Sequence, residues 1–189
     1  MKISYKFGSL VLTATLLGIG LSGCAASDKA ANEDGMMGMD HGSTHTMTIT
    51  DKQSLAEAMI PHHQQAIDMS AYAQTNTSNP DILAIAEKIT AEQGPEIDTM
   101  TPWLDGKSVN YMMMMDGMLS PMELSDLRAA KDKDFDKLYI QYMISHHEGA
   151  VKMAADAMNA NDPELSAFAN AIIVAQTAEI EELLALLKN

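Results

Sequence analysis

The sequence predicts an all-α protein, a four-helix bundle built from two repeated helical hairpins. The chain of 189 residues is 47% hydrophobic but only 5% aromatic, so Ala, Leu, Ile and Met must fill its core. Such a core suits helices better than a β-sandwich. Apolar residues recur at helical spacing in long segments, and a block rich in His and Met occurs twice. One folded domain is expected at this length.

Residues 1–23 predict a signal peptide, because two Lys precede an apolar run too short for a membrane-spanning helix. The run ends in Leu-Ser-Gly-Cys at 21–24, which resembles the bacterial lipoprotein cleavage box. That resemblance implies export to the cell envelope, on the periplasmic or extracytoplasmic side, with lipidation at Cys24. The alternative is an ordinary signal peptide followed by an incidental Cys. Cys24 is the only Cys, so neither a disulfide framework nor a thiolate metal site is expected.

The net charge of −14 argues against a nucleic-acid partner, which requires a basic surface. It argues equally against direct docking on an anionic membrane. Contact with a membrane is therefore expected only through the lipid anchor.

Residues 24–49 predict a flexible, lipidated tether, because they are small and polar and lack apolar periodicity. Met and His have no packing role in such a segment. They form a candidate auxiliary metal site, although a chance composition explains them equally well. These residues are Met36, Met37, Met39, His41, His45 and Met47.

Residues 50–189 predict the bundle. The long helices are expected at about 51–74, 80–104, 134–159 and 163–187, with a short helix from Pro121. Asn79-Pro80 and Asp162-Pro163 each supply an N-cap and a first-turn Pro. Thr50 with Gln53, and Ser54 with Glu57, match capping-box spacing at the first helix.

A Met-rich linker is expected at 105–120, between the two hairpins. Four consecutive Met cannot all face one core, so the linker is a second candidate auxiliary metal site. Its Met residues are Met112, Met113, Met114, Met115 and Met118.

The repeated block carries the candidate metal ligands. On a helix at 100° per residue, each copy places two His, two Met and a small Ala on one face, while its acidic residues point away. A nitrogen and sulfur surface without carboxylates suits a soft or borderline metal such as copper. The alternative is ordinary core packing, but a core does not require adjacent His twice. The candidate ligands are Met59, His62, His63, Met69, Met143, His146, His147 and Met153.

Gln93 and Gln176 occupy equivalent positions in the second helix of each hairpin. Counting back from the turns places them level with the His pairs. A Gln that faces the core needs hydrogen-bond partners, so each is a candidate to orient a His ring. Bonds to backbone or water are the alternative.

The Met-Ile-Pro-His-His-x2-Ala block at 59–66, the Gln-x2-Glu-Ile segment at 93–97 and the second Met-x2-His-His-Glu-Gly-Ala block at 143–150 resemble one known family. This is the bacterial domain-of-unknown-function family that includes CopM-type copper-binding proteins. The resemblance covers about residues 55–187. It implies a ferritin-like four-helix bundle, export to the cell envelope, copper binding and a contribution to copper resistance.

The leading hypothesis is an envelope copper-binding protein for copper buffering, resistance or transfer. Thioethers favour Cu⁺, and imidazole makes Cu²⁺ the second candidate. Neutral His binds the metal, so acid should compete near the ordinary His pKa of about 6.5. The sequence leaves open whether the His pairs share one site, whether copper or silver is preferred, and whether a transfer partner or a homo-oligomer exists.

Two other classes remain. One is a ferritin-like metalloenzyme, but no Glu-x-x-His motif of the di-iron type occurs and no catalytic residue is assigned, so an enzyme is not expected. The other is a metal-free helical lipoprotein that binds a protein partner, with its His and Met simply packed.

Overall fold

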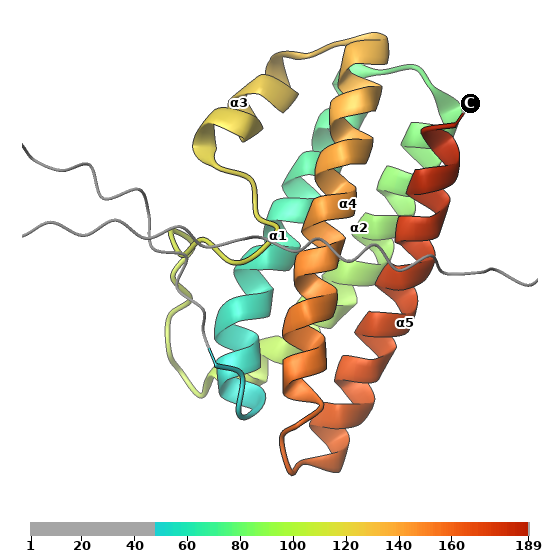
Figure 1. Cartoon of the computed structure of the whole chain (residues 1–189). Coiled ribbons are helices and arrows are strands. Elements are labelled where there is room, and N and C mark those ends of the chain that lie inside the picture. Colours follow the sequence, from blue (N-terminus) through green and yellow to red (C-terminus); the bar gives the residue numbers. More distant parts are fainter. Residues whose placement is uncertain (1–47, 189) are drawn as a thin grey trace, which may run out of the picture. The chain divides into compact units, whose positions relative to one another are not determined.

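The computed structural model describes residues 48–188, and these contain five α-helices and a short 3-10 helix but no strand. The predicted all-α class is confirmed. The long helices lie side by side, joined in pairs as hairpins, while a short helix sits on the connection between the hairpins (Figure 1). The helices are α1 (Lys52–Asn76), α2 (Pro80–Met100), α3 (Pro121–Ala129), α4 (Asp132–Ala157) and α5 (Pro163–Leu186). The predicted signal peptide and nearly all of the tether lie outside the described residues.

Helix α1 begins at a cap that the sequence analysis did not predict. The carboxylate of Asp51 accepts from Ser54 N at 2.8 Å, and the Ser54 hydroxyl accepts from Asp51 N at 3.1 Å. This reciprocal pair forms the capping box, so the predicted Thr50–Gln53 and Ser54–Glu57 pairs are wrong. The Asp51 carboxylate, rather than the hydroxyl of Thr50 or Ser54, caps the first turn by accepting from a backbone N–H. Pro61 lies inside α1, and the helix continues through it.

The other caps follow the predicted pattern. Asn79 caps α2, Asp162 caps α5, and each is followed by a first-turn Pro. Ser120 and Glu123 form a capping box at the start of α3. The α-helical part of α2 ends earlier than predicted, because the last turn, Thr101–Leu104, is a 3-10 helix.

The buried apolar side chains form two core clusters, and all four long helices contribute to both. The first core cluster includes Leu55, Met59, Met100, Met153, Leu165 and Ile172. The second core cluster includes Met69, Ile82, Ile89, Phe135, Met143 and Leu183. In each long helix a buried polar position lies between residues of the two clusters. The core of the bundle is therefore divided by a polar layer.

The hairpins contact each other directly between α1 and α4, and Lys88 of α2 pairs with Glu182 of α5 at 2.6 Å. No helix within residues 48–188 combines the length and apolarity needed to cross a bilayer.

Candidate metal centre

The polar layer is built around four His. His62 and His63 lie on α1, His146 and His147 lie on α4, and all four side chains are fully buried. Both pairs therefore face the interior of the bundle. The rings of His62 and His146 are in contact, with centroids 3.7 Å apart and ring planes inclined by 38°. The structure thus joins one His from each repeat at the α1–α4 interface.

Three of the four His donate a hydrogen bond through Nε2. His63 contacts Glu96 Oε2 at 2.7 Å, and His147 contacts Glu179 Oε2 at 2.8 Å. His62 contacts the backbone oxygen of Asp116 at 3.2 Å. Carbonyl and carboxylate oxygens accept, so Nε2 carries the proton on each of these rings. In the neutral form of such a ring, the lone pair is on Nδ1.

Within residues 48–188, none of the Nδ1 atoms of the four His has a hydrogen-bond partner, and neither does Nε2 of His146. Buried polar atoms are usually paired, and an unpaired one costs about 1–3 kcal/mol. A cluster of ring nitrogens with free lone pairs in one layer is therefore unusual for a packed core. It matches the arrangement of metal-binding His, which donate one ring N–H to a carboxylate or carbonyl and bind through the other nitrogen.

The structure corrects the predicted role of Gln93 and Gln176. Both are buried, but none of their side-chain N and O atoms has a hydrogen-bond partner among the residues that the structure describes. Glu96 and Glu179 lie one helical turn further along and pair with the His in their place. A carboxylate is a stronger acceptor than an amide oxygen, which favours this pairing.

The layer also contains carboxylates, contrary to the prediction of a surface without them. Acidic residues on the His-bearing helices do point away, as predicted, but Glu96 comes from α2 and Glu179 from α5. Sequence reasoning missed both as His partners. Their signal was present, because Gln-x2-Glu-Ile occurs at matching positions in the two hairpins.

The four predicted Met ligands are buried on both sides of the His layer. Met59 and Met153 belong to the first core cluster, while Met69 and Met143 belong to the second. This placement follows from the opposite directions of α1 and α4. Each repeat thus contributes one thioether to each side of the layer.

Burial keeps the central imidazoles neutral. The pKa of His62 is lowered to about 3, mainly by burial and in addition by repulsion from the nearby His63. Burial, followed by repulsion from His62, also lowers the pKa of His146 well below its ordinary value. The sequence-based expectation of acid competition used the ordinary pKa of about 6.5, and burial places the pKa of these two rings below that value in the folded protein.

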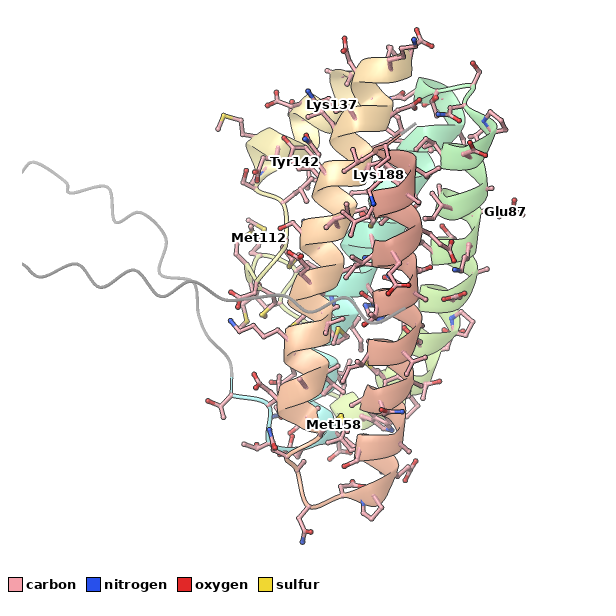
Figure 2. The ribbon with its side chains drawn as sticks, turned by 45° about the vertical axis from the view of Figure 1, so that its right-hand side comes forward. Glu87, Met112, Lys137, Tyr142, Met158 and Lys188 are labelled. Carbon is pink, nitrogen blue, oxygen red and sulfur yellow. The ribbon has the colours of Figure 1, made fainter. Side chains whose placement is uncertain are left out.

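The Met residues of the linker have divided roles. Met115 is buried in the first core cluster, and Met113 and Met118 pack partly against it. Met112 and Met114 are exposed, and Met112 lies at the surface beside the helices (Figure 2). The expectation that consecutive Met cannot share one core is confirmed. The predicted auxiliary ligands of the tether lie outside the described residues.

The donor set fits a soft or borderline ion better than a hard one. It offers neutral imidazole nitrogens with thioethers in the adjacent core, whereas a hard ion prefers oxygen ligands. Within residues 48–188, no three side chains among His, Cys, Asp and Glu are grouped so that they could hold a metal ion.

The fold and the layer define a helical protein with a buried, paired-His centre. The chain belongs to the DUF305 family, a domain of unknown function, whose family model matches residues 51–187. No curated protein sequence matches the chain.

Solved structures of the same kind support the assignment. The copper(II)-bound form of CopM is 34% identical, has a TM-score of 0.63, and covers 73% of this chain and 96% of its own. The copper(I)-bound form is 34% identical with a TM-score of 0.62, covering 74% and 96%. A DUF305 protein from Streptomyces coelicolor, described as secreted, is 27% identical with a TM-score of 0.66, covering 73% and 93%.

Proposed function

We propose that this protein binds copper in the buried His layer and serves copper buffering, resistance or transfer in the cell envelope. One observation carries the proposal. His62, His63 and His147 each donate Nε2–H to an oxygen of the protein, and their Nδ1 atoms have no partner within residues 48–188. That is the arrangement by which proteins fix the tautomer of a metal-binding His.

His62 and His146 form the centre of the proposed site. Because their rings are in contact, both can bind the same ion, which favours a single shared site over two separate ones. Met59, Met69, Met143 and Met153 supply the thioethers on either side. Thioether and neutral imidazole together favour Cu⁺, and imidazole also accepts Cu²⁺.

The relatives support this choice of metal. CopM, which is similar over most of the described chain, has been solved with Cu(I), with Cu(II) and with silver. Silver(I) resembles Cu⁺ as a soft ion and is a useful redox-stable probe of the same site. The role proposed here is binding and transfer of an ion rather than catalysis.

Replacing the central His pair is expected to abolish tight copper binding. His62→Gln/His146→Gln removes both contacting imidazoles and should lose nearly all high-affinity Cu⁺ capacity. The measurement is an anaerobic Cu⁺ titration against a chromophoric chelator at pH 7.5, with circular dichroism to verify helicity. His41→Gln/His45→Gln is the matched control, since it removes two tether His and should retain that capacity. Unchanged binding in the first variant would reject the His layer as the copper site.

The envelope location rests on the lipoprotein-like segment at 21–24 and on the secreted relative. Cys24→Ala is expected to release the protein from membrane fractions without changing its helicity, because only the anchor is lost. Mass spectrometry of the purified mature protein provides a direct check. A wild-type protein without an acyl mass would rule out the anchor.

A further inference from the structure

The linker approaches the His layer through its backbone, and Gln65 holds it there. The Gln65 amide donates to Leu119 O at 3.1 Å and accepts from Leu119 N at 2.7 Å. Gln65 lies on α1 between the His pair and Met69, and it is buried. Both hydrogen-bonding groups of one linker residue are thus satisfied by a single α1 side chain.

On the α4 side, the linker packs against backbone atoms of the helix rather than against side chains. A Cβ added to Gly149 would lie 1.9 Å from Asp116 O, and one added to Gly117 would lie 2.4 Å from Ser145 O. Gly117 also has a φ of +82°, which favours glycine. Lys152 forms an ion pair with the Asp116 carboxylate at the outer edge. No side chain fits between α4 and the linker at this point.

These contacts fix the position of one carbonyl. Asp116 O lies 3.2 Å from His62 Nε2 and accepts its proton. At the equivalent position of the second repeat, neither ring nitrogen of His146 has a hydrogen-bond partner in the described part of the chain. The linker therefore makes the two contacting rings unequal, although their helices carry the same motif.

We infer that residues 116–119 form a backbone cover that fixes the Nε2–H tautomer of His62, and that Gln65 is the positioning residue that seats this cover. His62 is then a ligand with a preset nitrogen, Nδ1, while His146 adapts to the ion. This inference rests on the proposed function for its effect on copper. The tautomer itself is a property of the metal-free protein.

The first test reads the tautomer directly. Long-range ¹H–¹⁵N spectra of the metal-free, ¹⁵N-labelled protein distinguish Nε2–H from Nδ1–H imidazole. Wild-type His62 is expected in the Nε2–H form alone, and Gln65→Ala is expected to show both forms. Gln64→Ala is the matched control, because the Gln64 amide donates to Asp68 of the same helix, at 3.0 Å, rather than to the linker. A single Nε2–H form in both wild type and Gln65→Ala would overturn the inference.

The second test measures Cu⁺ affinity of the same proteins. Loss of a group that orients a metal-binding His typically weakens binding about 10- to 100-fold. We expect a loss of about 10-fold in Gln65→Ala and none in Gln64→Ala. Gln65→Glu keeps the acceptor for Leu119 N but loses the donor, so an intermediate loss is expected; it carries the test if Gln65→Ala does not fold. Equal affinity in all variants would overturn the effect on copper.

The two readouts separate this inference from the proposed function. If wild-type protein shows the fixed tautomer but retains no Cu⁺, the copper assignment fails and the positioning of His62 stands. If wild-type protein binds Cu⁺ and Gln65→Ala alters neither the tautomer nor the affinity, only the inference fails.

Discussion

Acidifying the metal-free protein from pH 7 to pH 5 is expected to lower its free energy of unfolding by about 2 kcal/mol through His62 alone. The folded pKa of His62 is about 3, whereas an exposed His in the unfolded chain has a pKa of about 6.5. Between pH 6.5 and the folded pKa, only the unfolded chain takes up a proton on His62. Stability is therefore full above pH 6.5 and is lost as the pH falls toward the folded pKa. His146 adds a loss of the same sign.

Urea denaturation at pH 7, 6 and 5 in the presence of a chelator measures this loss. His62→Phe keeps an aromatic ring but cannot titrate, so its free energy of unfolding should fall less steeply with acid. Equal slopes for wild type and His62→Phe would show that His62 is not the group that destabilises the folded protein.

Gly149→Ala is expected to destabilise the fold by about 2 kcal/mol, although Ala is the better helix former. A Cβ at this position meets both Asp116 O and its carbonyl carbon at 2.5 Å or less, so the linker backbone must move. Displacing the linker also separates the Asp116 carbonyl from His62 and withdraws Met115 and Leu119 from the core. These losses exceed the gain of about 1 kcal/mol from helix propensity.

Gly94→Ala provides the matched control, because a Cβ there has no atom within 4 Å. The gain in helix propensity from this substitution is opposed by the following Pro95, because a side chain on the residue before Pro disfavours the helical conformation. A change below about 1 kcal/mol is therefore expected at Gly94. Chemical denaturation of both variants makes the comparison, and a Gly149→Ala protein at least as stable as wild type would contradict the close packing of the linker.

Local signals made the helices predictable. The N-caps and first-turn Pro of α2 and α5 are readable from the chain, because they satisfy their helix ends with neighbouring residues. The inward direction of the His pairs was equally readable, since helical periodicity places His62 and His146 on the same face as buried Met.

The partners of those His were not predictable in the same way. Periodicity describes one helix at a time, whereas the contact of Glu96 with His63 depends on how α2 is rotated against α1. Counting residues back from the turn placed Gln93 level with the His pair. This count is not accurate to one helical turn, so Glu96 was missed. The contact of the Asp116 carbonyl with His62 could not be predicted for a different reason. The linker has no periodicity, and it approaches α4 closely because Gly149 has no side chain.

The division of the core into two clusters has a consequence for helix register. An apolar seam alone permits neighbouring helices to slide by one turn, about 5.4 Å, and still bury similar surfaces. Here such a slide of α5 along α4 would separate His147 from Glu179 and leave a buried carboxylate without its partner. A slide of α2 along α1 would likewise separate the buried His63 from Glu96, whose carboxylate is partly exposed. The polar layer thus selects one alignment within each hairpin.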